Sequence, residues 1–282
     1  MACARCGAQK GHFYDCPDSG FAVAPVSAPV QVVDDAPRLF ERARLVALPV
    51  VLGVMLALCF TGFGHMLVRI FFGMWLHELG HAATSWFTGG FAIPLPWLTR
   101  GGERSVPFTL FLFAGLGAWA WWLRSREARA WWVPAALMGV LVLGLSVPAR
   151  PREALIIFMG DGGALLFGTA LMATVFLPDG ARLSHGGLRW GFLVIGAGGF
   201  SDIAVQWLSA KRDWAEIPFG RNEGAGLSDA TRLVDQLGWS EQRLVNSYLT
   251  FTAVCFGALV VGWVLAFLRR RGRARAGLHA RA

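Results

Sequence analysis

The sequence predicts an all-α protein, a polytopic bundle of about six or seven transmembrane helices preceded by a short N-terminal segment that resembles a metal site. Hydrophobic residues make up 55% of the 282 residues and charged residues only 16%, whereas a soluble domain carries about 25% charge. The chain also contains apolar runs near the roughly 20 residues that a helix needs to cross a bilayer. These observations exclude a disordered chain and an ordinary soluble protein.

Seven runs of low charge follow one another along the sequence. Four of them contain no Lys, Arg, Asp or Glu, namely 45–68, 105–123, 130–148 and 244–268. The other three, 70–99, 154–178 and 190–210, each contain a single acid: Glu78, Asp161 and Asp202, respectively. A backbone in lipid must satisfy its own hydrogen bonds, so we expect these runs to be helical. The glycine-rich stretch 61–65 predicts a tight turn between the first two.

The membrane domain is expected over residues 44–268, between a linker at 21–43 and a basic tail at 269–282. Within it we predict one motif-bearing helix at 66–88, a second at 154–178 that carries an Asp-Gly pair, and a water-exposed segment over 209–243. In that segment Ser228 is positioned to cap a short helix that runs to Leu237 and ends at Gly238.

Arginine supplies 24 of the 26 basic residues, which is typical of a GC-rich bacterial genome, and the net charge is +8. Such an excess can indicate nucleic-acid binding, but in a membrane protein it more often marks cytoplasmic segments, so we expect lipid contact and no nucleic acid. Arginines flank both ends of the domain, at positions 38, 42, 44, 269, 270, 271, 273 and 275. Seven crossings cannot place both ends in the cytoplasm. Either one run is re-entrant, or the N-terminus lies outside the cytoplasm despite its arginines.

The second run contains His77-Glu78-Leu79-Gly80-His81, an H-E-x-x-H motif. Residues four apart lie on one face of a helix, so both imidazoles can reach one zinc ion, with Glu78 placed to touch a zinc-bound water. An ionisable group at bilayer depth costs about 2.5 kcal/mol or more without a partner. Zinc explains all three residues better than two core histidines and a buried carboxylate do.

A catalytic zinc usually takes three protein ligands and leaves a position for water. For the third ligand we favour Asp161, in Asp161-Gly162-Gly163, over Asp202, because these two acids lie inside apolar runs and must have a reason to be there. Asp179 is a further candidate, although a Pro-Asp-Gly turn is the simpler interpretation of its surroundings.

These motifs resemble the site-2 protease family of intramembrane zinc metalloproteases, which pairs a membrane-embedded H-E-x-x-H with an Asp-Gly motif on a later helix. The resemblance implies that His77, His81 and Asp161 bind zinc and that Glu78 is catalytic. Residues 81–90 and 226–230 are similar to the smaller bacterial branch of that family. Residues 89–102, bracketed by glycine pairs, are expected to form a re-entrant connector, or else an extended edge for a peptide.

The N-terminus has a separate candidate metal site, with four ligand types in 14 residues: Cys3, Cys6, His12 and Cys16. Their spacing is close to that of a zinc knuckle, and a zinc ion would stabilise a segment too short for its own core. Such clusters can also be redox-active or adventitious.

The sequence therefore predicts an integral-membrane zinc metalloprotease that cuts a membrane-anchored protein. Zinc would activate water and Glu78 would act as general base. The alternatives are a non-catalytic zinc-binding scaffold or regulatory protein of the same fold and, less favoured, a metal-ion transporter, which should carry polar residues all through the bilayer.

Overall fold

The computed structural model describes residues 36–177, 181, 183, 187–222 and 226–279. The chain divides into two compact units, residues 1–41 and 42–282. Of the first unit only the start of helix α1 (Ala36–Cys59) is described. The predicted knuckle residues Cys3, Cys6, His12 and Cys16 therefore lie outside the described residues, as do most of the 21–43 linker and Asp179.

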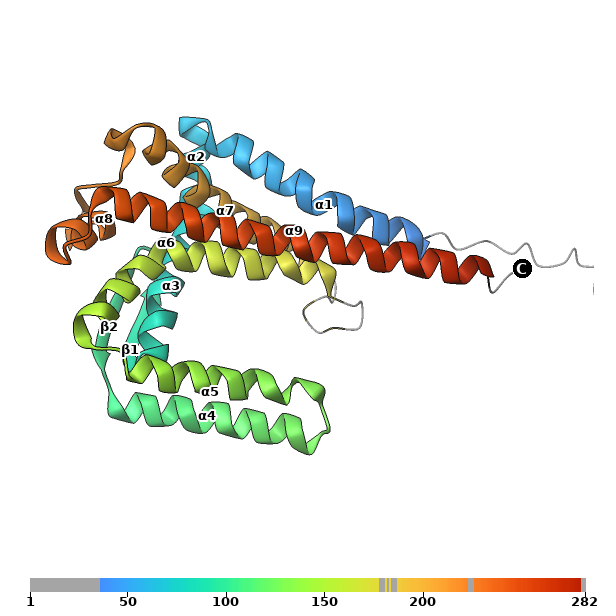
Figure 1. Cartoon of the computed structure of the whole chain (residues 1–282), viewed down its shortest axis with the longest axis horizontal. Coiled ribbons are helices and arrows are strands. Elements are labelled where there is room, and N and C mark those ends of the chain that lie inside the picture. The colour runs from blue at the N-terminus through green and yellow to red at the C-terminus, as the bar shows by residue number, and fades with distance from the viewer. Residues whose placement is uncertain (1–35, 178–180, 182, 184–186, 223–225, 280–282) are drawn as a thin grey trace, which may run out of the picture. The chain divides into compact units, whose positions relative to one another are not determined.

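The second unit is mostly helical (Figure 1). Among the described residues, four helical segments are long and apolar enough to cross a membrane: α4 (Val106–Ser125), α6 with its 3-10 extension (Ala149–Phe176), α7 (Leu188–Arg212) and the Glu241–Arg269 part of α9 (Glu241–His279). Two shorter apolar segments accompany them, Ala43–Cys59 within α1 and Arg129–Leu145, which ends in α5 (Trp132–Leu145). The chain is thus a membrane protein by the length and composition of its helices.

The all-α prediction was too simple, because the structure contains two small antiparallel sheets. Strands β1 (Gly90–Leu95) and β2 (Leu98–Arg104) form a hairpin that pairs Pro94 with Thr99. The indole nitrogen of Trp86 donates to the carbonyl oxygen of Ala92 at 2.8 Å, which holds the hairpin against the preceding helix. Residues 90–104 thus form an extended hairpin, which is the conformation that the peptide-edge alternative requires.

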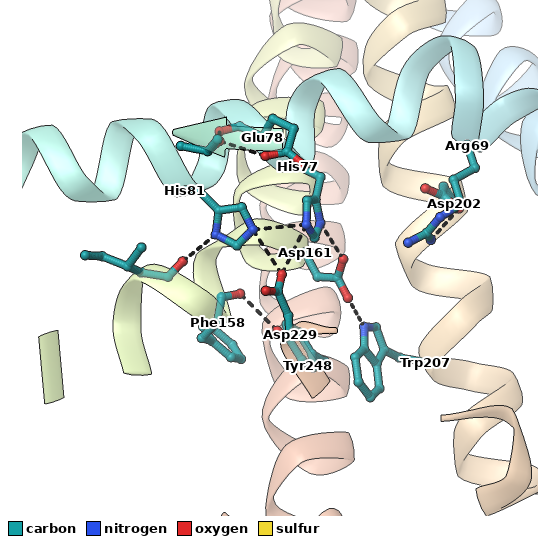
Figure 2. Close-up of polar contacts among 12 residues, drawn as sticks. Arg69, His77, Glu78, His81, Phe158, Asp161, Asp202, Trp207, Asp229 and Tyr248 are labelled. Atoms are coloured by element: carbon teal, nitrogen blue, oxygen red, sulfur yellow. Dashed lines mark hydrogen bonds and ion pairs between the residues drawn. The ribbon is translucent and has the colours of Figure 1, made fainter. Parts of the chain in front are cut away.

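The predicted 66–88 helix is a composite of three parts. These are α2 (Gly62–Val68), a π-helical turn η1 (Arg69–Gly73) and α3 (Met74–Phe87). In Figure 2, α3 runs across the long helices instead of alongside them. A Cβ on Gly80 would overlap the carbonyl oxygen of Met159, and one on Gly163 would overlap Gly80 in return. Glycines at this crossing therefore let the backbones of α3 and α6 touch.

Helix α6 also packs closely against α7, which runs in the opposite direction. A Cβ on Gly168 would meet Gly196 and Phe200, and one on Gly196 would meet Gly168. Helix α9 runs parallel to α6, because Tyr248 bonds the carbonyl of Phe158 while Gly262 lies near the ring of Phe176. The main core cluster lies among these helices and α1.

The segment between α7 and α9 folds back toward α3 and α6. It comprises η5 (Trp214–Glu216), β3 (Arg221–Asn222), β4 (Gly226–Leu227), α8 (Asp229–Thr231) and the π-helical turn η6 (Arg232–Gln236). The hydroxyl of Ser228 accepts from the Thr231 amide at 3.3 Å, and Gly238 has a φ of 73°. The predicted cap at Ser228 and stop at Gly238 are confirmed, and the capped turn starts with Asp229.

Candidate metal centre

His77 and His81 lie on the same face of α3, as their spacing predicts (Figure 2). Their Nε2 atoms are 3.1 Å apart, and the two rings meet edge to face with centroids 4.6 Å apart. A side-chain Oδ2 of Asp229 completes the group, 3.1 Å from Nε2 of His77 and 3.0 Å from Nε2 of His81. Three ligand atoms from α3 and α8 thus converge on one point.

The Nδ1 atoms of both rings have partners on α6. Nδ1 of His81 lies 2.8 Å from the carbonyl oxygen of Ile156, which can only accept, so this nitrogen carries the proton. Nδ1 of His77 lies 2.9 Å from Oδ1 of Asp161. Metal-binding histidines characteristically donate from one ring nitrogen to a carbonyl or carboxylate and bind the ion with the other.

A divalent metal fits this group. If both rings are neutral with Nδ1 as the donor, their Nε2 lone pairs face the Asp229 carboxylate, and a positive charge must lie among these three atoms. That charge is a proton on an imidazole when no ion is bound, and a bound cation would take its place. Ligands about 2.0–2.2 Å from a tetrahedral zinc lie roughly 3.3 Å from one another, close to the separations seen. Gly160 adds room, because a Cβ there would come within 2.6 Å of both imidazoles. The described residues thus contain a candidate metal site of His77, His81 and Asp229.

The environment of Asp229 favours its charged form. Burial raises the pKa of this carboxyl, but the charge of His81 and the contacts with both imidazoles lower it more, so the pKa lies below its usual range. The carboxylate is therefore ionised at neutral pH and suited to bind a cation.

The structure places Asp161 elsewhere than the sequence led us to expect. Its Oδ1 contacts Nδ1 of His77, on the far side of the ring from the converging Nε2 atoms, and its Oδ2 accepts from the indole nitrogen of Trp207 at 2.8 Å. Both oxygens are thus occupied. In this arrangement Asp161 orients a histidine, and the carboxylate of the converging group is Asp229.

The other expected candidate, Asp202, does not join the group. It is 1% exposed on α7, where its Oδ1 lies 2.8 Å from Nε2 of His65 and 3.5 Å from Nη1 of Arg69. A Cβ on Gly73 would overlap its other oxygen. Asp202 therefore links α7 to the α2–η1 segment through its contacts with His65 and Arg69. These contacts supply the polar partners that a buried carboxylate needs.

Asp229 is not predicted from the sequence, because it lies outside the apolar runs in which a buried acid requires a partner. The available signal was its position directly after Ser228, at the start of a capped turn in the segment between two spans. Asp229 is partly buried in the structure only because that segment folds over α3 and α6.

Glu78 occupies the position that the motif gives it, next to His77 and 5% exposed. The hydroxyl of Thr99, in β2, donates to Oε2 of Glu78 at 2.7 Å and also lies 2.9 Å from the backbone oxygen of Glu78. A pocket of about 480 Å³ is lined by Glu78, Thr99 and the three residues of the metal group. Glu78 and the metal group therefore line one pocket.

No protein-family model matches the chain, and neither a curated protein nor a solved structure is similar to it. Its function must be inferred from the geometry of the site.

Proposed function

We propose that the chain is an integral-membrane zinc metalloprotease of the site-2 type, located in a bacterial cytoplasmic membrane and acting on membrane-anchored proteins. The observation that carries this proposal is the shared pocket of Glu78 with His77, His81 and Asp229. Two imidazoles and one carboxylate are a common ligand set of catalytic zinc, which leaves a coordination position free. The H-E-x-x-H motif and the resemblance to that protease family point the same way.

A bound zinc would supply a Lewis acid that polarises the scissile carbonyl and makes water acidic near neutral pH. The residues of this chain do the remaining work. Glu78 takes a proton from the attacking water and delivers it to the leaving amine. Thr99 holds one oxygen of that carboxylate in place, while Asp161 and the carbonyl of Ile156 fix the two histidine rings.

The topology that accompanies this proposal has six crossings. The four long spans are joined by Ala43–Cys59 and Arg129–Leu145, whose length of 17 residues each is at the lower limit for a crossing. The α2–η1–α3 run does not cross. This arrangement resolves the conflict between the two arginine-rich ends, because an even number of crossings returns the chain to the same side.

The protease proposal is tested with the variant Glu78→Gln in purified protein reconstituted with a panel of membrane-anchored test substrates. We expect the same zinc content in both proteins, measured by plasma mass spectrometry, and cleavage only by the wild type. Glu103→Gln is the matched control, because Glu103 lines the same pocket but is exposed. It should cleave normally.

Cleavage that survives Glu78→Gln would show that the assigned base is wrong. Stoichiometric zinc without hydrolysis of any test substrate by the wild type would favour the alternative, a zinc-binding scaffold or regulatory protein of the same fold.

A further inference from the structure

A groove separate from the metal pocket lies between the first turns of α6 and α9. These two candidate spans run parallel and side by side, so both begin at the same end (Figure 1). The groove measures about 340 Å³ and its lining includes Arg150, Arg243, Trp239 and Phe158. Arginine and tryptophan at the end of a span are typical of the membrane interface, where lipid headgroups lie.

The two arginines give this groove a positive charge that nothing in its lining offsets. Arg243 stacks on Trp239, with its guanidinium carbon 4.3 Å from the ring centroid, and Arg150 donates to the carbonyl of Leu237 at 3.5 Å. Among the described residues neither forms an ion pair with a carboxylate, and no acid lines the groove. Each guanidinium carries five N–H donors, so most of them remain available to an anion. The amino-terminal ends of two helices add to this positive potential.

A second groove continues from this charged end along α9. It measures about 530 Å³ and shares Phe158 and Arg243 with the first. The rest of its lining is mixed, with the polar Asn246, Ser247 and Thr250 beside the apolar Phe251 and Val254. Val254 is 63% exposed, and Leu155 of the first groove is 39% exposed. The two grooves together present a cationic end and, along Phe158, Phe251 and Val254, an apolar path toward the middle of the spans. A cationic end beside an apolar path suits an anionic headgroup with an acyl chain.

We propose that this double groove binds an anionic phospholipid, with its phosphate between Arg150 and Arg243 and one acyl chain along Phe158, Phe251 and Val254. Guanidinium groups bind phosphate oxygens through paired, charge-assisted hydrogen bonds. Basic pockets between spanning helices bind anionic headgroups on the cytoplasmic side of membranes, and the same guanidinium–phosphate contacts are possible at this end of the spans. The inference is independent of the protease proposal, because it uses none of the residues of the metal pocket.

The test is native mass spectrometry of the full chain in detergent, titrated with phosphatidylglycerol or phosphatidylethanolamine. We expect one phosphatidylglycerol molecule to bind per chain, with a higher affinity than phosphatidylethanolamine. The double variant Arg150→Ala/Arg243→Ala should weaken that binding roughly tenfold or more. The matched control is Arg124→Ala/Arg126→Ala, since these arginines also stack on tryptophans, Trp131 and Trp122, but line neither groove. The control should bind as the wild type does.

A second variant keeps both arginines and fills the groove. Ala154→Phe adds a ring to the lining and should also weaken phosphatidylglycerol binding, while an unchanged melting temperature shows that the fold is intact. Equal binding of the two lipids, equal loss in the control, or full displacement by millimolar inorganic phosphate would overturn the proposal. The last result would mean that the anion alone is recognised.

Discussion

At the scale of single residues, the metal group depends on two carboxylates with different tasks. Asp229 faces both Nε2 atoms, while Asp161 faces only Nδ1 of His77. Asp161 is in turn held by Trp207, which is 1% exposed and stacks on Tyr248 with centroids 4.2 Å apart. Tyr248 stacks on Phe158 and bonds its carbonyl oxygen. An aromatic ladder from α7, α9 and α6 thus supports one histidine.

The two carboxylates should therefore differ in their effect on zinc affinity. We expect Asp229→Ala to lower the zinc content by one ion per chain, because it removes a residue of the candidate metal group. Asp161→Asn should lower the affinity by about 10-fold to 100-fold, the usual effect of losing an outer partner. Trp207→Phe, which keeps the stack but removes the hydrogen bond, should have a smaller effect in the same direction. Competition with a chromophoric chelator measures all three. A larger loss for Asp161→Asn than for Asp229→Ala would reverse the two roles.

Thr99 offers a second test at this scale, which rests on the proposed function. Its hydroxyl, in β2, donates to the Glu78 carboxylate of α3, and a hydrogen bond to a charged group contributes about 1.5–3 kcal/mol. We expect Thr99→Val to lower kcat by roughly tenfold or more, with zinc content unchanged. Thr99→Ser keeps the hydroxyl and should restore most of the rate. If valine and serine variants behave alike, the hydroxyl does not position Glu78.

At the scale of secondary-structure elements, the crossing of α3 over α6 is what assembles the site. It brings the two histidines of α3 within reach of Ile156 and Asp161 on α6. Helix α3 can approach this closely because Gly80 and Gly163 meet without side chains between them. The turn before α3 is fixed separately, by the contacts of Asp202 with His65 and Arg69.

A methyl group at this crossing should therefore be costly. Gly80→Ala must push α3 from the carbonyl of Met159, and overpacking of this kind typically costs about 1–3 kcal/mol. We expect a lower melting temperature in detergent together with weakened zinc binding. Gly115→Ala in α4 is the control, because a Cβ there meets nothing within 4 Å. Its melting temperature should stay the same or rise slightly, since alanine favours helix. Equal melting temperatures for the two variants would contradict the close crossing.

At the scale of the whole molecule, the directions of the helices within residues 42–282 place the site at one end of the bundle. The indole nitrogen of Trp263, late in α9, donates to the carbonyl of Leu45, early in α1, at 2.8 Å. The start of α1 and the end of the apolar part of α9 therefore share one face. The metal group lies toward the opposite face, where α6 and α9 begin and α7 ends. Arg42, Arg44 and Arg269 near the shared face favour its cytoplasmic orientation.

Labelling with a membrane-impermeant maleimide should confirm this topology in intact cells. In a background without the native cysteines, we expect Ser146→Cys and Ser240→Cys to be labelled from outside. Ser125→Cys should be labelled only after the cells are opened, because Ser125 lies at the far end of α4. All three side chains are exposed. Labelling of Ser125→Cys and Ser240→Cys from the same side would exclude the six-crossing arrangement.

Much of this protein could be predicted from local sequence. Charge-free runs identify membrane helices because the cost of burying charge in lipid applies residue by residue. The shared face of His77 and His81 follows from the repeat of an α-helix, and the turn from Ser228 to Gly238 follows from capping chemistry. Each of these properties depends on neighbours within a few positions.

Only the tertiary structure decided which carboxylate meets the two histidines. Asp229 is separated from them by about 150 positions, and it is partly buried through the folding of a polar segment, not through an apolar sequence around it. The same holds for the 62–87 run, which has the apolar character of a span but lies across α6 and α7 because glycines allow the close contacts. Local chemistry therefore determined the membrane helices and two of the three residues of the candidate metal group, whereas long-range packing determined the third residue and the path of the chain.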